Sequence, residues 1–285
     1  MLGSIQIDGY DNRGGSMMFM TNITLGQYVP ADSAMHKLDP RCKIAMTIVS
    51  IAVIFMCWTF PALMLWAALL PAVIYVSKLP VNSVLRSVKP VFMLIIFTSL
   101  LHVFFTPGVN LFKLYFISVS REGVDMALRL SIRLTFMVIY ASMLTLMTSP
   151  SELSDGLESM MSPFKKIGVP AHEIAMMMTI ALRFIPTLFE ETGRLLKAQA
   201  SRGADFESGG LVRRAKAYIP VLIPLFVLVF QRADTLAFAM ESRCYNGGEG
   251  RVRMRPLEWK TLDTAASVFF IFFVVLAIMV NRLTS

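Results

Sequence analysis

Uncharged apolar runs separated by short charged segments are the main pattern of this chain. The first run, residues 44–77, contains no charged residue. As one helix it would extend about 51 Å at roughly 1.5 Å per residue, too long for a hydrocarbon core of about 30 Å. Trp-Thr-Phe-Pro at 58–61 lies at its middle, where aromatic residues favour the membrane interface and proline interrupts a helix. We therefore predict a hairpin of two membrane helices, with Lys43 and Lys78 on the same, inner side.

Two further apolar runs predict a third and a fourth crossing. Residues 91–112 contain no Asp, Glu, Lys or Arg and follow residues 78–89, which we interpret as a short cytoplasmic connection. Thr-Pro-Gly at 106–108 is a turn signal that marks the outer end of the third crossing. The fourth crossing is expected to begin after Asp125 and to continue to Thr148.

Two arginines in the fourth crossing conflict with this topology. Arg129 and Arg133 would put positive charge near the outer leaflet, whereas basic residues usually mark the inner side. Four residues separate them, so they lie on one helix face. Two arrangements are open: the side chains extend to the interface, or they pair with Glu122 or Asp125.

From Ser149 onward the pattern becomes amphipathic. A first helix is predicted at 151–166, with Ser149 or Ser151 at its N-terminus. A second, at 171–202, would be about 48 Å long, and Pro186 is expected to kink it. Its apolar and polar faces are formed by Ile174, Met178, Ala181, Ile185, Leu188 and Leu195, and by Glu190, Arg194, Lys197 and Ser201.

The last third of the chain contains two more apolar runs. Residues 217–231 are interrupted by Pro220 and Pro224 and fall short of a usual spanning length, which favours an interfacial helix, with a crossing as the alternative. Residues 264–280 are the final crossing. A basic cluster that precedes it should remain inside: Arg251, Arg253, Arg255 and Lys260. Five crossings follow, with the N-terminus inside and the C-terminus outside.

Two of the predicted helices end in a similar tripeptide. Ser201-Arg202-Gly203 closes the first, and Ser242-Arg243-Cys244 closes the second, with Asn and Gly just beyond. Gly and Asn tolerate the left-handed conformation that ends a helix, so each arginine is predicted at a helix tip. A cation there gains roughly 0.3–1 kcal/mol from the helix dipole. The alternative is docking, because a guanidinium can bind a carboxylate through two parallel hydrogen bonds.

Composition supports an all-α integral membrane protein. The mean hydropathy is +0.62 and 55% of the 285 residues are hydrophobic, far outside the range of soluble domains. The formal charge of +8 is therefore assigned to cytoplasmic loops and lipid contacts and not to nucleic acid. We divide the chain into an N-terminal cytoplasmic lead-in (1–43), four membrane helices (44–148), cytoplasmic or interfacial coupling helices (149–259) and a C-terminal membrane helix (260–285).

The chemistry of enzymes and ion-coupled carriers is missing from the sequence. It has no GxxxxGK[ST], HExxH, CxxC or GxSxG motif. Its three histidines and its cysteines, Cys42, Cys57 and Cys244, are widely spaced and form no metal or disulfide pattern. The runs at 44–77 and 91–112 offer no Asp, Glu, Lys or Arg for ion coupling. We expect no catalytic residue, cofactor or metal in this chain.

Together, the two tripeptides and an N-terminal segment resemble one family. That segment contains Gly-Gln-Tyr-Val-Pro at 26–30, Asp-Ser at 32–33 and His-Lys-Leu-Asp-Pro-Arg at 36–41. From about residue 25 to its end, the chain resembles the transmembrane T component of energy-coupling factor (ECF) vitamin transporters. The resemblance implies coupling helices that enter grooves on two ABC-type ATPase subunits, which bind ATP and Mg, and one or more S subunits that bind the vitamin.

Carried onto this sequence, the resemblance makes Arg202 and Arg243 the ATPase-docking residues, with Ser201, Gly203, Ser242 and Cys244 around them. The family motif reads Ala-Arg-Gly or a close variant. This chain has Ser before each arginine and Cys after the second.

Two other groups have both a structural and an interface interpretation. Asp39-Pro40-Arg41 is either a turn that anchors the first helix, which we favour, or a brace for the coupling helices. Met176, Met177 and Met178 either fill irregular apolar space or form an adaptable face for several partners.

The predicted function is a cell-membrane scaffold that couples ATP hydrolysis to vitamin uptake, with its N-terminus and coupling helices in the cytoplasm. The alternatives are a permease or channel with its own substrate path, and a membrane scaffold without a transport role.

Overall fold

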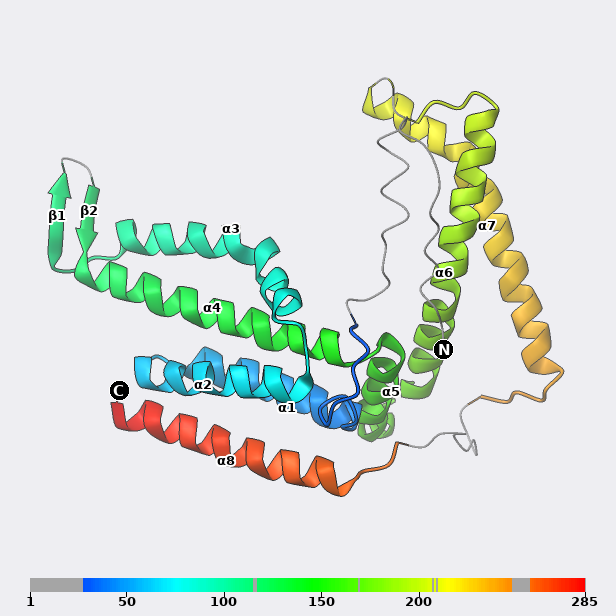
Figure 1. The fold of residues 1–285 in the computed structure, drawn as a ribbon. Coiled ribbons are helices and arrows are strands. Elements are labelled where there is room, and N and C mark those ends of the chain that lie inside the picture. The colour runs from blue at the N-terminus through cyan, green and yellow to red at the C-terminus, as the bar shows by residue number, and fades with distance from the viewer. Residues whose placement is uncertain are drawn as a thin grey trace. The chain divides into compact units, whose positions relative to one another are not determined.

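A computed structural model describes residues 28–114, 117–168, 170–206, 208, 210–247 and 257–284 (Figure 1). The chain forms two compact units. The larger unit comprises residues 26–179 and 250–285, and the smaller unit comprises residues 1–25 and 180–249.

The larger unit is mainly helical. Its elements are α1 (Pro40–Met56), α2 (Phe60–Ser77), α3 (Val81–Phe105), β1 (Asn110–Leu114), β2 (Ile117–Ser120), α4 (Arg121–Met147), α5 (Pro150–Met161), a 3-10 helix (Ser162–Ile167) and α8 (Thr261–Thr284). Helix α6 (Ala171–Ser201) begins in the larger unit and continues into the smaller one, which also contains α7 (Leu211–Glu241). Six of these helices are long and apolar enough to cross a membrane: α2, α3, α4, α6, α7 and α8.

The predicted helix break within 44–77 is confirmed, between Met56 and Phe60. Helix α2 is long enough to cross a membrane, whereas a crossing by the 17-residue α1 stays a prediction. A side chain from the other end of the chain satisfies the backbone groups that the break exposes. The Asn281 Oδ1 atom of α8 accepts hydrogen bonds from the amides of Trp58 (3.1 Å) and Thr59 (3.3 Å). The Asn281 amide group also donates to the Met56 carbonyl at 3.3 Å.

The boundaries of the third and fourth crossings differ from the prediction. Helix α3 already begins at Val81 and continues through Pro90, so most of the expected connection at 78–89 is helical. Packing explains this, because Val84 is buried in the core of the unit. After its bend, α3 runs alongside α4 (Figure 1). Helix α4 begins at Arg121, before the expected start, because the Ser120 hydroxyl accepts from the Gly123 amide at 3.0 Å and caps the helix.

A β-hairpin between α3 and α4 was not predicted. Strands β1 and β2 pair antiparallel, with Leu114 opposite Ile117. Thr106 ends α3 as expected.

Arg129 and Arg133 both bind the end of α1. The Arg133 Nη2 atom donates to the Cys57 carbonyl at 2.7 Å, and the Arg129 Nη1 atom donates to the Trp58 carbonyl at 3.0 Å. Arg129 also pairs with Asp125 at 2.6 Å, which confirms one of the two predicted arrangements. The carbonyls at a helix C-terminus carry partial negative charge, so they attract cations.

The helices after α4 follow the predicted pattern more closely. Ser149 and Glu152 form a capping box at the start of α5, and α6 matches the predicted helix to within one residue. Helix α7 begins six residues before the apolar run at 217–231 and runs unbroken through Pro220 and Pro224 for 31 residues. The short-length argument against a crossing therefore does not apply, although the depth of α7 in a membrane stays a prediction.

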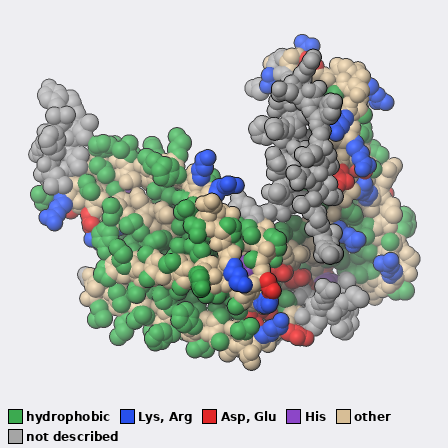
Figure 2. Space-filling view, viewed as in Figure 1, with side chains coloured by type: hydrophobic (Ala, Val, Ile, Leu, Met, Phe, Trp, Pro, Cys, Tyr) green, Lys and Arg blue, Asp and Glu red, His purple; other side chains and the backbone are tan. Residues whose placement is uncertain are grey.

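The core of the larger unit lies where α2, α4 and α8 meet. Trp66 is fully buried and makes edge-to-face contacts with Tyr140 and Phe273, at centroid distances of 5.2 and 5.0 Å. Tyr140 donates its hydroxyl to the Trp66 carbonyl at 3.1 Å. The face of this unit that Figure 2 shows is also largely hydrophobic, as expected for a surface in contact with lipid.

Candidate functional site

The C-terminal ends of α6 and α7 have the same backbone geometry. At the α6 end, Gly203 takes a left-handed conformation (φ +85°), its amide donates to the Ala200 carbonyl, and the Ala204 amide donates to the Gln199 carbonyl, both at 3.0 Å. These two hydrogen bonds define a Schellman motif, in which the residue before the left-handed position is still helical. Arg202 is this residue, directly before Gly203.

The α7 end has the same arrangement, with Cys244 in the left-handed position instead of a glycine. Cys244 is left-handed (φ +56°), its amide donates to the Glu241 carbonyl at 2.9 Å, and the Tyr245 amide donates to the Met240 carbonyl at 3.0 Å. Arg243 therefore corresponds to Arg202, and Ser242 corresponds to Ser201. The predicted helix tips are confirmed as structure, and their similarity extends from the sequence to the backbone.

The side chains at both tips face solvent. Ser201, Arg202 and Gly203 are exposed, as are Ser242, Arg243 and Cys244. Within the part of the chain that the structure describes, neither arginine has a side-chain hydrogen bond or an ion pair. Each guanidinium thus keeps its five donors available for a partner.

The structure does not bring the two tips together. Helices α6 and α7 run in opposite directions and cross, so that their C-termini lie at opposite ends of the pair (Figure 1). At the crossing, the Arg232 Nη2 atom lies 3.2 Å from the Glu191 Oε1 atom. Arg202 follows Glu191 by eleven residues and Arg243 follows Arg232 by eleven residues. Each arm therefore extends about 16 Å beyond the crossing, at roughly 1.5 Å per residue.

The Glu191–Arg232 contact was not predicted from the sequence. Both residues are charged positions within long amphipathic helices, and nothing in their spacing identifies them as partners. Arg194 also approaches Glu191, at 3.6 Å. Beside this contact, α6 and α7 enclose an apolar groove of about 340 Å³ in the smaller unit. Its walls include Phe184, Leu188 and Leu236.

The left-handed residues allow a direct test of tip stability. A non-glycine residue in this conformation costs about 1 kcal/mol or more. We therefore expect Cys244→Gly to stabilise the last turn of α7 by about 1 kcal/mol, and Gly203→Ala to destabilise that of α6 by a similar amount. Amide hydrogen exchange of the two terminal turns, followed by mass spectrometry, measures both effects.

Gly193→Ala is the matched control for that comparison. Gly193 lies inside α6 without a positive φ, and an added Cβ atom would meet nothing within 4 Å. Alanine there should slow exchange, because glycine in a helix interior costs about 1 kcal/mol relative to alanine. If Gly203→Ala also slowed exchange, the left-handed conformation would not be the constraint.

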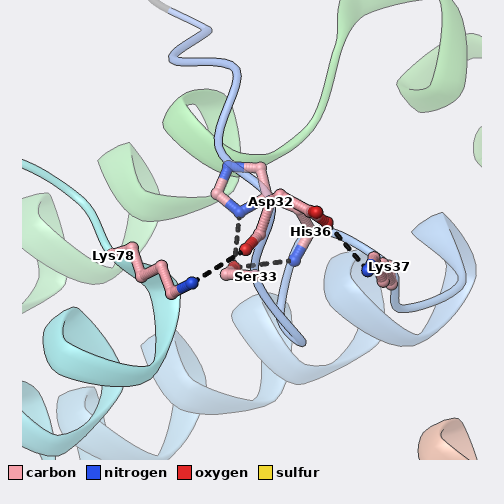
Figure 3. Close-up of polar contacts among 5 residues, drawn as sticks. All are labelled: Asp32, Ser33, His36, Lys37 and Lys78. Carbon is pink, nitrogen blue, oxygen red and sulfur yellow. Dashed lines mark hydrogen bonds and ion pairs between the residues drawn. The ribbon is translucent and has the colours of Figure 1, made fainter.

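The N-terminal segment that carries the family resemblance is tied together by short-range contacts (Figure 3). The Ser33 hydroxyl lies 2.7 Å from His36 Nδ1, and His36 Nε2 lies 3.1 Å from the Val29 carbonyl. Both contacts suit a neutral ring that donates from Nε2 and accepts at Nδ1. Burial lowers the pKa of His36, which favours the same neutral form. Gly26 and Gln27 lie outside the described residues.

Asp32 connects this segment to α2. Lys37 pairs with the Asp32 carboxylate at 2.7 Å and, mainly through this hydrogen bond, lowers the pKa of Asp32. Lys78, just after α2, donates to the Asp32 carbonyl at 3.3 Å (Figure 3).

Asp39, Pro40 and Arg41 form the start of α1. The Asp39 carboxylate accepts from the Arg41 amide at 2.9 Å and caps the helix, and Pro40 occupies the first helical position, where it needs no amide partner. The Asp39 amide donates to the buried carboxylate of Asp263, at the start of α8, at 2.7 Å. These contacts support the structural interpretation, and a bracing role toward the coupling helices stays a prediction.

Asp263 was missed from the sequence, although a signal was available. It is the single acidic residue in the first turn of the last apolar helix. Its second carboxylate oxygen accepts from the Lys260 amide at 2.8 Å, so one buried side chain joins the N-termini of α1 and α8.

The three consecutive methionines lie near the start of α6. Met177 and Met178 are 58% and 37% exposed, so they are accessible to a partner, whereas Met176 is half-buried. Their role as an interface stays a prediction. Within the described ranges, no cluster of three His, Cys, Asp or Glu side chains is arranged to hold a metal ion.

Most of the chain is similar in sequence to known proteins. The profile of the CbiQ family, described as cobalt transport protein, matches residues 31–254. The chain is 56% identical over 250 residues to the energy-coupling factor transporter transmembrane protein EcfT of Thermanaerovibrio acidaminovorans, which covers 88% of this chain and 93% of the relative. The proteins of the same name from Clostridium kluyveri and Bacillus subtilis are 48% and 40% identical, over 90% and 88% of this chain and 96% of each relative.

Proposed function

Because the chain belongs to the CbiQ family and is an EcfT-type transmembrane component of an energy-coupling factor transporter, we propose a coupling role for it. In this role, it links ATP hydrolysis by two ABC-type ATPase subunits to the movement of a vitamin-binding S subunit. It is a non-catalytic, multi-pass membrane protein. ATP and Mg are bound by the ATPases. The N-terminus and the two tips face the cytoplasm.

The repeated helix tip is the observation that carries this proposal. Two arginines occupy equivalent positions in two Schellman motifs, both exposed and both without a side-chain partner in the described chain. A pair of similar sites at opposite ends of two crossed helices suits a pair of similar partners. Arg202 therefore docks one ATPase and Arg243 docks the other, each through charge-assisted hydrogen bonds to a carboxylate.

The crossed helices also suggest how motion is transmitted. When the ATPases close on ATP, the two tips approach each other, and the arms of about 16 Å rotate about the Glu191–Arg232 contact. This rotation changes the apolar surface that α6 and α7 offer to the S subunit within the smaller unit, on which Phe226 and Phe230 are exposed. Coupling requires such a difference in contacts between two states.

The transported compound binds to the S subunit in this proposal. The family description names cobalt, whereas the resemblance of the motifs points to vitamin transporters. In the larger unit, the Asp263 carboxylate accepts from the Asp39 amide, and Arg129 and Arg133 donate to carbonyls at the end of α1.

Reconstitution tests this function. Uptake of a radiolabelled vitamin into proteoliposomes should require this chain, two ATPases and an S subunit together, and omission of any one should reduce ATP-driven uptake to background. Uptake by this chain alone would instead identify a permease with its own path. Uptake that persists without this chain would exclude the coupling role.

A further inference from the structure

A narrow apolar groove lies between α2 and α4 in the larger unit. Its volume is about 280 Å³, close to the lower end of the roughly 300–1,000 Å³ typical of ligand pockets. The residues that line it are Phe60, Leu63, Met64, Ala67, Ser131, Ile132, Thr135 and Phe136. The hydroxyls of Ser131 and Thr135 donate to carbonyls of their own helix, so the walls present almost no free polar group.

One end of the groove carries a cation. The Arg129 guanidinium lies over the ring of Phe60, at 5.0 Å from its centroid, and Phe60 is the first residue of α2 that lines the groove. Arg129 is half-buried, and its Nε atom is buried without a hydrogen-bond partner in the described chain. Its two terminal nitrogens each make one contact, to Asp125 and to the Trp58 carbonyl.

A second cation strengthens the local positive charge. Arg133 is 4% exposed, lies 4.2 Å from the centroid of the Trp58 ring, and has no carboxylate partner among the described residues. The stretch of α4 from Asp125 to Arg133 therefore holds two guanidinium groups and one carboxylate, that of Asp125. It lies at the end of the helices opposite to Lys43, whose ammonium contacts the Met147 carbonyl at the far end of α4.

We propose that this groove binds an anionic phospholipid, with the phosphate at Arg129 and one acyl chain along the groove between α2 and α4. Two features of the site suit such a lipid. The guanidinium has unused donors for the phosphate, and the apolar groove leads away from it as a channel that can hold an acyl chain. From Phe60 to Ala67 the channel is about 10 Å long, which lies within one leaflet of a core about 30 Å thick. Trp58, 56% exposed beside the site, is placed as aromatic residues are at the interface.

The size of the groove favours an acyl chain over a helix of a partner protein. A helix with its side chains is about 10–12 Å across, so 10 Å of it occupies roughly 800 Å³ or more, well above the groove volume. Apolar contact alone does not distinguish a bound lipid from bulk lipid, because acyl chains are as apolar as the groove. Selectivity must therefore come from the arginine, and retention from the shape of the channel.

Native mass spectrometry of the full-length, delipidated chain in detergent tests the site. Palmitoyl-oleoyl phosphatidylglycerol and the matching phosphatidylcholine are added separately at equal concentration. We expect the first phosphatidylglycerol to bind about fivefold better, the ratio that one cation contributes toward anionic lipid. Arg129→Gln should remove this preference, whereas Arg121→Gln, at the exposed start of the same helix, should leave it within twofold.

A second pair of variants tests the channel separately from the charge. Ala67→Phe fills the groove, whereas Ala68→Phe adds the same ring at the next, exposed position, which does not line the groove. Ala67→Phe should lower phosphatidylglycerol retention about fivefold relative to Ala68→Phe. This pair also decides the question if Arg129→Gln does not fold.

Three results would overturn the proposal. One is equal retention of the two lipids by the unaltered chain, and another is equal retention by the Ala67→Phe and Ala68→Phe variants. The third is retention of glycerol 3-phosphate to the same extent as the lipid, since the groove would then contribute nothing. If the Ala67→Phe variant retained the lipid but no longer bound a membrane protein that the unaltered chain binds, the groove would be a site for a protein helix instead.

Discussion

Reversal of charge at Arg202 or Arg243 is expected to reduce retention of the ATPases at least about 30-fold, and reversal at both should abolish it. Truncation of one partner of a hydrogen-bonded charge pair at an interface costs about 2–5 kcal/mol, and each 1.4 kcal/mol corresponds to a factor of about ten. Arg→Glu adds repulsion against a carboxylate on the partner. The measurement is co-purification with the ATPases in mild detergent, followed by ATP-driven uptake.

Lysine variants distinguish docking from simple charge. Arg202→Lys and Arg243→Lys keep the positive charge and its interaction with the helix dipole, but they lose the planar pair of donors. We expect them to weaken assembly by about tenfold, between the unaltered chain and the Glu variants. If the Lys variants assemble as well as the unaltered chain, the contact is only electrostatic.

Two exposed cations of the same unit serve as controls for charge reversal. Lys197 lies one turn before the α6 tip and Arg214 lies in the first turn of α7, and both are exposed. Lys197→Glu and Arg214→Glu should leave ATPase retention within about threefold, since rim charges contribute mainly to association rate. Full assembly and uptake in the Arg202→Glu, Arg243→Glu double variant would refute the docking role of the tips.

Asp263→Ala is expected to destabilise the larger unit strongly. The carboxylate is 1% exposed and accepts from the Asp39 amide at 2.7 Å and from the Lys260 amide at 2.8 Å. A hydrogen bond to a charged group is worth about 1.5–3 kcal/mol, and its loss leaves a buried amide unsatisfied. We expect a total loss of roughly 3–5 kcal/mol, read as a fall of roughly 10 °C in the thermal unfolding midpoint in detergent.

Asp263→Asn and Glu258→Ala complete that experiment. The Asn side chain has almost the same volume, but its amide group places a donor against one of the two backbone amides, so most of the loss should remain. Glu258 is exposed five residues earlier, and Glu258→Ala should change the midpoint by less than about 2 °C, because exposed substitutions usually stay within 0.5 kcal/mol. A midpoint unchanged in Asp263→Ala would show that α1 and α8 do not depend on this carboxylate.

Local signals accounted for most of the helices. The hairpin break at 58–61 follows from residues that are adjacent in the chain, and so do the capping box at Ser149 and the two Ser-Arg tips. At the capping box and at both tips, the deciding hydrogen bonds span no more than five residues. The helix tips could thus be located, and even their left-handed residues anticipated at Gly203, before any tertiary structure was known.

Short sequence motifs did not predict the structure correctly where packing between distant segments determines it. The charges of Lys78, Arg86 and Lys89 suggested a connection at 78–89, but α3 already begins at Val81, because Val84 is buried in the core. The β-hairpin after Thr106 was missed because its strands are only five and four residues long, too short for a strong periodic signal. Arg129 and Arg133 were ambiguous because their partners, the carbonyls at the end of α1, are more than 70 residues away.

Sequence alone was sufficient to assign the membrane class, the family and the positions of the two arginine tips, because composition, helix endings and short motifs are properties of neighbouring residues. The tertiary structure decided which side chains meet. It paired Asp263 with Asp39 across 224 residues, crossed α6 and α7 at Glu191 and Arg232, and placed Arg129 at the mouth of the α2–α4 groove. Such contacts depend on how helices pack against each other, and no local pattern specifies which residues of two distant helices become neighbours.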